Sequence, residues 1–272
     1  MDVNNDRRAD IIVASNESGN GKNRNNVWLY LNEGEACNPD FKLSTKNFLV
    51  DEMLITSVGS HPAFYDYNGD GLLDMIVGTN GVGEAGQTRQ NRMFLFTNIG
   101  TKNSPAFELT NEDFLQLSAF PNTLSRLAPC FGDLDGDGDA DLFVGNSQGG
   151  VLLFQNDGLE QGKTNFRLIT TDFQNIFVGP NSSPVIYDFD KDGLLDFIIG
   201  ESNNSLNFYK NKGSKNAPFF DDLSNELPNT DNLGKLFNNN NFATQNGSPE
   251  VFASSGQMYL LMGNNSDSLS LY

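Results

Sequence analysis

The sequence has few basic residues and no long apolar run. Lys and Arg number 17 against 35 Asp and Glu, a formal net charge of −18. Long-range repulsion then disfavours binding to nucleic acid or to an anionic membrane surface, and cations are the natural counterparts. No apolar stretch approaches the roughly 20 residues of a membrane-spanning helix, so membrane insertion is not expected. The first residues contain no apolar signal segment, so an export signal would have to lie outside this chain.

Histidine and cysteine are also scarce. The one histidine, His61, precedes Pro62 at the start of a predicted strand and is interpreted as structural. Cys37 and Cys130 stand in unlike contexts, and the sequence does not decide whether they pair. The motif GNSQG at 145–149 runs into a predicted strand and lacks the helix and histidine of a nucleophile elbow. GVGEAG at 81–86 also precedes a strand rather than a dinucleotide-binding helix. We therefore predict a non-catalytic chain with no organic cofactor.

What the sequence does contain is an internal repeat. With 38% hydrophobic residues the chain can bury a core. An acidic stretch followed by an apolar run recurs about every 60 residues, and such a period indicates one supersecondary unit per repeat. The four copies are DVNNDRRADIIV from Asp2, DYNGDGLLDMIVG from Asp66, DLDGDGDADLFVG from Asp133 and DFDKDGLLDFIIG from Asp188.

Two further marks accompany the acidic stretch. A proline stands four residues before three of the copies, as Pro62, Pro129 and Pro184, and a later strand ends in Asn-x-Gly. Short β-branched and aromatic runs bounded by Gly, Asn and Asp predict strands, with no helical period of useful length. The expected fold is all-β, a β-propeller of about five four-stranded units. The units are expected at about 1–41, 42–107, 108–166, 167–219 and 220–272.

The fifth unit keeps the fold signals and loses the acidic stretch. It has Pro249, Ala253 in place of the first Asp, and a shorter connection to Gly263. The first unit lacks its proline-bearing strand, and the last lacks the Asn-x-Gly turn. We therefore expect a piece of a longer chain, for example of a seven-bladed propeller, or a propeller closed in another way.

The acidic stretches have the ligand spacing of a calcium loop. Calcium takes six to eight oxygen ligands, and a loop can supply them from positions 1, 3 and 5, the carbonyl of position 7 and, here, position 9. Glycine at position 6 allows the sharp turn. The sequence predicts three calcium sites and a less complete fourth, in which Arg7 replaces the glycine. The predicted ligands are Asp66, Asn68, Asp70, Leu72 and Asp74; Asp133, Asp135, Asp137, Asp139 and Asp141; Asp188, Asp190, Asp192, Leu194 and Asp196; and, in the less complete loop, Asp2, Asn4, Asp6, Arg8 and Asp10.

Two other interpretations of these loops were weighed. An EF-hand needs a bidentate Glu at position 12 and flanking helices, whereas position 12 here is Val77, Val144 or Ile199 in a predicted strand. Asp, Asn and Gly also make good hairpin turns without a metal. The recurrence of every feature in three loops, and their joint loss in the fifth unit, favours metal binding. Magnesium fits less well because it prefers a tight octahedron with retained waters.

The repeated D-x-[DN]-x-D-G-x-x-D pattern, with its preceding proline and with Phe131-Gly132, resembles the FG-GAP or VCBS repeat of integrin α-subunit propellers and of secreted bacterial propellers. The resemblance covers nearly the whole chain. It implies a calcium-binding propeller of an extracellular or cell-surface protein, acting in adhesion or ligand binding.

A protein or glycan partner is expected on loops at one face. Trp28, Tyr30 and Tyr209 would stack on a sugar if exposed, but their strand positions favour core packing. The alternative function is an accessory or scaffold domain of a larger secreted enzyme, such as a polysaccharide-degrading one.

Overall fold

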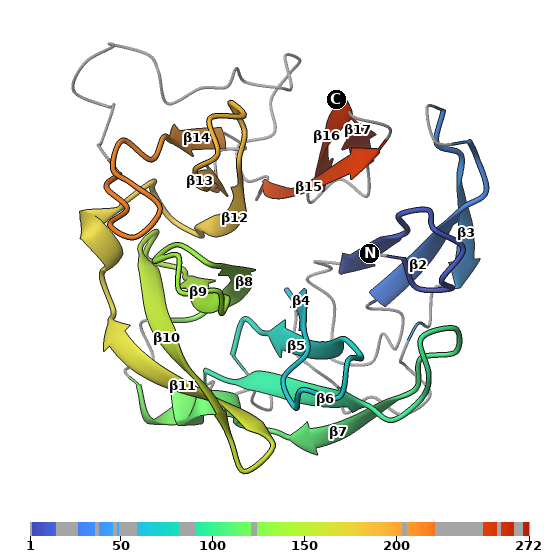
Figure 1. The fold of residues 1–272 in the computed structure, drawn as a ribbon, viewed down its shortest axis with the longest axis horizontal. Coiled ribbons are helices and arrows are strands. Elements are labelled where there is room, and N and C mark those ends of the chain that lie inside the picture. Colours follow the sequence, from blue (N-terminus) through green and yellow to red (C-terminus); the bar gives the residue numbers. More distant parts are fainter. Residues whose placement is uncertain are drawn as a thin grey trace. The chain divides into compact units, whose positions relative to one another are not determined.

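The fold consists of small β-sheets. The computed structural model describes residues 2–14, 27–35, 38–45, 48, 59–81, 91–120, 124–202, 206–220, 247–254, 257–263 and 269–271. These residues form five sheets of three or four strands (Figure 1), and their only helical elements are two short 3₁₀ segments, Phe114–Ala119 and Phe173–Asn175. The all-β class and the blade-like units predicted from the repeat are confirmed.

Each sheet is built from strands that follow one another in the sequence, and no strand crosses to another sheet. Tight turns and short loops therefore suffice to connect most neighbours within a sheet. The sheets are β1 (Ile11–Ala14), β2 (Val27–Asn32) and β3 (Phe41–Thr45); β4 (His61–Tyr65), β5 (Asp74–Gly78), β6 (Met93–Asn98) and β7 (Phe107–Asn111); β8 (Ala128–Gly132), β9 (Asp141–Gly145), β10 (Val151–Glu160) and β11 (Lys163–Thr170); β12 (Ser183–Tyr187), β13 (Asp196–Gly200) and β14 (Leu206–Tyr209); and β15 (Ser248–Ser254), β16 (Gln257–Gly263) and β17 (Leu269–Leu271).

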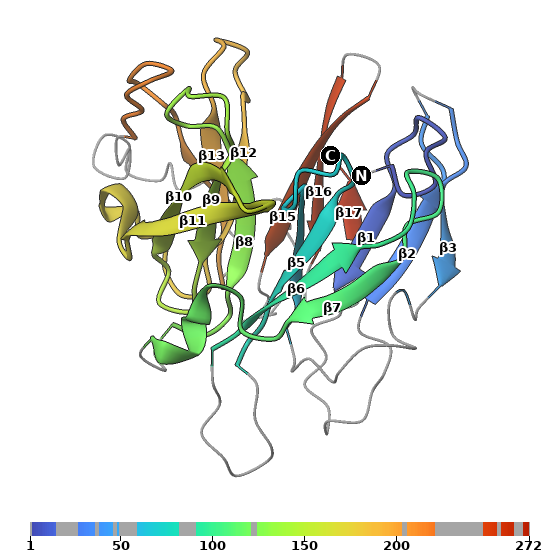
Figure 2. The same ribbon diagram turned by 60° about the horizontal axis from the view of Figure 1, so that its bottom comes forward.

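The chain divides into two compact units. The first comprises Met1–Leu127, Val251–Leu261 and Leu271–Tyr272, and it contains the sheets β1–β3 and β4–β7. Figure 2 shows β5, β6 and β7 lying side by side. Alternate side chains of these strands form a core, because residues two apart in a strand point to the same face. That core consists of Met75, Val77, Phe94, Phe96 and Phe107.

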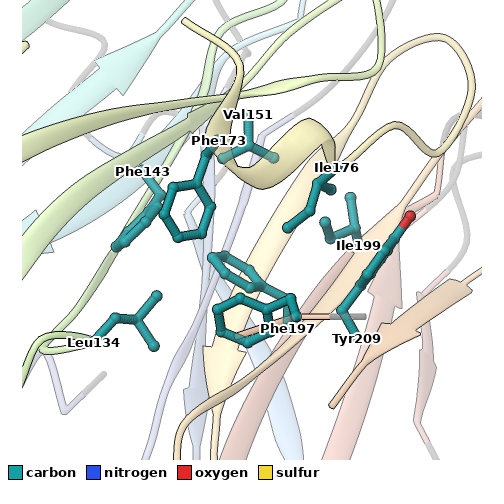
Figure 3. Packing of buried hydrophobic residues seen from close by; sticks show 9 residues of the cluster. Leu134, Phe143, Val151, Phe173, Ile176, Phe197, Ile199 and Tyr209 are labelled. Carbon is teal, nitrogen blue, oxygen red and sulfur yellow. The ribbon is translucent and has the colours of Figure 1, made fainter. Parts of the chain in front are cut away.

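The second unit comprises Ala128–Glu250 and Met262–Ser270 and contains the sheets β8–β11 and β12–β14. Its core is rich in aromatic rings, seen in Figure 3. The rings of Phe143 and Phe197 meet edge to face with centroids 5.4 Å apart, and Phe173 lies 5.2 Å from Phe143. Such edge-to-face pairs add about 0.5–1.5 kcal/mol each beyond the area they bury.

The repeated apolar run forms the most buried strand of each sheet. All five residues of β5, of β9 and of β13 are buried. A strand covered on both faces is expected to be continuously apolar rather than alternating. The prolines stand on the neighbouring strands β4, β8 and β12, each at the edge of its sheet. An edge strand tolerates proline because one row of its backbone groups takes no part in the ladder.

The glycines that end β9 and β13 make room for the backbone of the following repeat. A Cβ atom built on Gly145 would lie 2.3 Å from the carbonyl oxygen of Ser182, and one on Gly200 would lie 2.3 Å from that of Gly247. Any larger residue would push this backbone away. In the fifth sheet, β15 and β16 leave only residues 255 and 256 between them, so the strands persist where the acidic loop does not.

Candidate metal-binding loops

The acidic stretches close hairpins between an edge strand and a buried strand. We call residues 2–10, 66–74, 133–141 and 188–196 loops 1 to 4. Loops 2, 3 and 4 each end on the first residue of a buried strand, where the cross-strand partners are Tyr65 and Asp74, Gly132 and Asp141, and Tyr187 and Asp196. Loop 1 leads into β1, which is an edge strand of its sheet and has no described strand before it. The predicted ligands are therefore held at one end of a rigid strand pair.

The ninth-position aspartate is the buried anchor of each loop. Its carboxylate accepts the backbone N–H of the Asn in the Asn-x-Gly turn that follows the next strand. In loop 4, Asp196 Oδ1 accepts from Asn211 N at 2.8 Å and Oδ2 from Phe189 N at 3.2 Å. Loops 1 and 2 have both bonds as well. In loop 3 the structure gives Asp141 only the bond from Asn156 N, at 2.9 Å.

Burial makes the charged form of these anchors costly. Asp141 is 4% exposed. Burial, together with the negative charges of Asp135, Asp137 and Asp133, raises its pKa to about 6, although the bond from Asn156 N opposes the shift. Burial likewise raises the pKa of Asp74 and of Asp196. A nearby cation would reverse this effect, because an opposite charge favours the carboxylate.

The first-position aspartate folds the loop around itself. In loop 4, Asp188 accepts N–H bonds from Asp192 at 3.1 Å and from Gly193 at 3.0 Å. Asp66 in loop 2 and Asp2 in loop 1 make the same pair of bonds. Loop 3 differs slightly, because Asp133 accepts from Gly136 at 2.7 Å and from Gly138 at 3.2 Å. The short side chain thus takes the place of backbone partners in a turn.

Position 6 has a left-handed backbone in every loop. Gly71, Gly138 and Gly193 have φ of 83°, 103° and 89°. Arg7, which replaces the glycine in loop 1, adopts φ of 69°. The loop conformation is therefore preserved at a conformational cost to an L residue of about 1 kcal/mol. Loop 1 differs in its charges rather than in its backbone path.

Carboxylate oxygens converge in loops 3 and 4. Ligand atoms of Asp133, Asp135 and Asp137 all lie within 4.8 Å of one another, and so do those of Asp188, Asp190 and Asp196. Asp141 and Asp139 stand outside the first group, and Asp192 stands outside the second. Within the described residues, loop 2 brings no three carboxylates this close. There Asn68 occupies position 3, and its amide Nδ2 donates to Asp70 Oδ2 at 2.9 Å.

The loops differ in the positive charges beside them. In loop 1 the Arg8 guanidinium donates to Asp6 Oδ2 and to the carbonyl of Gly34, and it lowers the pKa of Asp6. In loop 4 the Lys210 ammonium pairs with Asp190 and lies 3.0 Å from Asp192 Oδ2, lowering the Asp192 pKa. Among the described residues, no Lys or Arg forms an ion pair with a carboxylate of loop 2 or loop 3.

The position-7 residues use their N–H groups inside the loop. Leu72, Asp139 and Leu194 donate to the position-5 Asp at 2.8–2.9 Å, and Arg8 does the same in loop 1. These bonds fix the peptide that precedes each residue. Ligation by the carbonyl oxygen of position 7 stays a prediction.

The Asn of each Asn-x-Gly turn belongs to the site, which the sequence pattern alone did not indicate. Asn156 donates its N–H to Asp141 and its side-chain amide to the carbonyl of Ala140 at 3.1 Å. Its Oδ1 then accepts from Gly158 N at 2.9 Å. Asn32, Asn98 and Asn211 are buried in the equivalent places. The repeat contains a signal for this role, because Asn-x-Gly recurs with the acidic stretch, but the pattern by itself indicates only a turn.

The other residues singled out from the sequence take structural places. Tyr209 is buried in the core of the second unit, as the core interpretation predicted, while Trp28 and Tyr30 are half-buried neighbours. GNSQG forms the turn between β9 and β10, as predicted. Residues 82–86 of GVGEAG and Cys37 lie outside the described residues. Cys130 is a free thiol on β8.

His61 lies on β4, half-buried. Burial and the charge of Arg126 lower its pKa to about 4, so the ring is neutral at physiological pH. No described helix is long and apolar enough to cross a membrane.

The fold and the loops together define a class of protein: an all-β repeat protein whose blade-like sheets carry acidic hairpin loops. FG-GAP-like repeats match residues 2–77 and 133–199, more than half of the chain. The chain belongs to the FG-GAP-like repeat family, which confirms the resemblance seen in its motifs. Repeats of this family occur in extracellular adhesion-type β-propellers and are generally non-catalytic. No curated protein matches the chain.

Proposed function

We propose that the chain is a calcium-binding, non-catalytic module of an extracellular or cell-surface protein, and that it binds a protein or glycan ligand through its variable loops. The observation that carries the proposal is the convergence of Asp133, Asp135 and Asp137 within 4.8 Å. Three carboxylates this close repel one another, and within the described residues no side-chain cation pairs with them. A divalent cation would supply the missing positive charge.

The donor chemistry supports calcium over other metals. Every predicted side-chain ligand in loops 2, 3 and 4 is a carboxylate or amide oxygen. Hard oxygen donors suit Ca²⁺ and Mg²⁺, whereas zinc and copper prefer nitrogen and sulfur. A flexible loop with five or more oxygen atoms suits the larger, irregular shell of calcium better than a magnesium octahedron. Millimolar extracellular calcium would fill such loops even at modest affinity.

Calcium in these loops would brace the sheets. Loop 3 joins the edge strand β8 to the buried strand β9, and Asp141 links it to Asn156 at the end of β10. A cation in the loop would therefore tie three strands of one sheet together. The proposed role of the metal is to stabilise the scaffold, and ligand recognition would fall to loops that differ between repeats.

Calcium titration by calorimetry, with thermal melting in calcium and in chelator, tests this proposal. Because a ligand that binds the folded state stabilises it by mass action, calcium at 100 times its Kd should add about 2.7 kcal/mol per site. Asp137→Ala should remove one site and its share of the melting shift. Glu160→Ala, an exposed carboxylate on β10, is the matched control and should behave as the wild type.

Fewer than two calcium sites, or melting unchanged by chelator, would contradict the proposal. The ligand class is tested separately by glycan-array and protein-binding assays in calcium. Binding without turnover supports a binding module, whereas hydrolysis of a bound glycan would support the catalytic alternative.

A further inference from the structure

Among the described residues, basic side chains form ion pairs with the carboxylates of loops 1 and 4 and with none of those of loops 2 and 3. Lys210, which reaches loop 4, directly follows β14 and stands just before the Asn of the Asn-x-Gly turn. The same place in the other repeats is occupied by Leu31, Thr97 and Gln155. In loops 3 and 4 the side chain at this position reaches the acidic loop of its own sheet, and it adds a neutral donor in one case and a charge in the other.

The geometry in loops 3 and 4 is parallel. Gln155 Nε2 donates to Asp135 Oδ2, at position 3, at 3.2 Å. Lys210 Nζ donates to Asp190, also at position 3, and lies 3.0 Å from Asp192 Oδ2 at position 5. The two side chains therefore engage the same ligand position, one with a neutral amide and the other with a full positive charge.

The amide in loop 3 is itself held in place. Gln155 Oε1 accepts from Arg167 at 2.9 Å, and Arg167 forms a two-point ion pair with Asp157 at 2.7 and 2.9 Å. The guanidinium that holds Gln155 is thus paired with Asp157, a carboxylate outside the loop. Gln155 therefore gives loop 3 a hydrogen bond from its neutral side-chain amide and adds no charge to the loop.

We propose that the residue before each Asn-x-Gly asparagine sets the cation affinity of its loop, and that Lys210 is a tethered competitor for the cation in loop 4. The inference rests on the proposed calcium function. Lys210 occupies carboxylate oxygens of Asp190 and Asp192 that calcium would need, and an ammonium group a few ångströms from a divalent ion repels it. Calcium should therefore fill loop 3 first and loop 4 only at higher concentration.

In loop 1 the cation that pairs with a loop carboxylate is Arg8, a residue of the loop itself. Its guanidinium is bonded to Asp6 and to the carbonyl of Gly34. Loops 1 and 4 are then partly neutralised by the protein's own cations, whereas among the described residues no Lys or Arg forms an ion pair with a carboxylate of loop 2 or loop 3. A protein built this way keeps part of its scaffold independent of calcium.

An exchange of the two side chains tests the inference. Lys210→Gln gives loop 4 the residue of loop 3, and Gln155→Lys does the reverse. By calorimetry, Lys210→Gln should tighten one calcium site about tenfold or reveal one further site, and Gln155→Lys should weaken one site by a similar factor. Lys163→Gln makes the same charge change at an exposed place at the start of β11 and should leave every affinity unchanged.

Thermal melting separates competition from a structural role. In chelator, Lys210→Gln should lower the melting temperature, because the loop 4 carboxylates lose their partner. In excess calcium the deficit should vanish or reverse. An equal deficit in both buffers would mean that Lys210 is merely structural and would overturn the inference.

The failures of the two proposals look different. If the wild type binds calcium, loses one site in Asp137→Ala and keeps all affinities in Lys210→Gln, the inference is wrong and the calcium function stands. If the wild type binds none but Lys210→Gln binds one, Lys210 is a competitor and the wild-type function is wrong. No binding by either protein overturns both.

Discussion

Loops 3 and 4 have nearly the same sequence pattern and different electrostatics. Both bring three carboxylates within 4.8 Å. In loop 4 Lys210, which directly follows β14, pairs with Asp190 and Asp192, and the anchor Asp196 accepts two backbone N–H bonds. In loop 3 no described basic side chain forms an ion pair with the carboxylates, and Asp141 accepts one bond. The repeated motif therefore fixes the path of the chain, whereas the charge beside each of these two loops depends on residues outside the motif.

The largest expected effect comes from removing the anchors. Asp196→Ala removes the acceptor of two backbone N–H groups, those of Phe189 and Asn211. Asp141→Ala removes the acceptor of one, the buried N–H of Asn156. An unsatisfied buried donor costs about 1–3 kcal/mol. In calcium-free buffer we expect Asp196→Ala to lower the free energy of unfolding by about 3 kcal/mol and Asp141→Ala by about half as much, measured by denaturant titration. Equal losses would contradict the hydrogen-bond difference.

The pH dependence contributed by Asp141 in loop 3 and that contributed by Asp192 in loop 4 should have opposite signs. The pKa of Asp141 is raised to about 6, while an unfolded chain has Asp near 3.9. Between these values the folded state holds the extra proton, so calcium-free stability from this group falls as pH rises from about 4 to 6, by up to about 3 kcal/mol. Asp141→Asn should remove that slope in a pH series of denaturant titrations.

Asp192 should change the stability with pH in the opposite direction to Asp141. Lys210 lowers its pKa, so its contribution to stability is present above the ordinary carboxyl pKa and is lost as pH falls through the lowered one. Asp192→Asn should therefore cost stability at neutral pH and nothing in strong acid. Slopes of the same sign in the two variants would refute the contrast between the loops.

Much of the fold was predictable because it depends on local chemistry. Proline on the edge strand, the continuous apolar run and Asn-x-Gly are each tied to one backbone environment. The placement of the Asp loops between paired strands followed from the same pattern. These features repeat because β5, β9 and β13 are each buried and each pair with an edge strand that carries the proline.

The contacts that distinguish the loops were not predictable in the same way. Lys210 lies 20 positions from Asp190, and only the pairing of β13 with β14 brings it across. The missing second bond of Asp141 has no sequence signal, since loops 2, 3 and 4 share Asp at position 9. The role of Asn156 as a donor to the anchor likewise depends on strand register.

The smallest effect concerns the turn of loop 1, which shares its backbone path with loops 3 and 4. Arg7 holds φ of 69° where Gly138 holds 103°. A left-handed backbone costs an L residue roughly 1–2 kcal/mol, and the greater freedom of glycine in the unfolded chain offsets part of this. Arg7→Gly should therefore raise the free energy of unfolding by about 0.5 kcal/mol.

Gly138→Ala is the reverse change and should cost about 1 kcal/mol, since nothing lies within 4 Å of the added methyl and the cost is conformational alone. Denaturant titration in chelator measures both variants, and Gly158→Ala, at φ of 86° outside the loops and equally open, is the control for the glycine effect. If Arg7→Gly destabilises the protein instead, the Arg7 side chain contributes more to loop 1 than its backbone costs. The positive charge of Arg7 would then stabilise loop 1 by more than its left-handed backbone destabilises it.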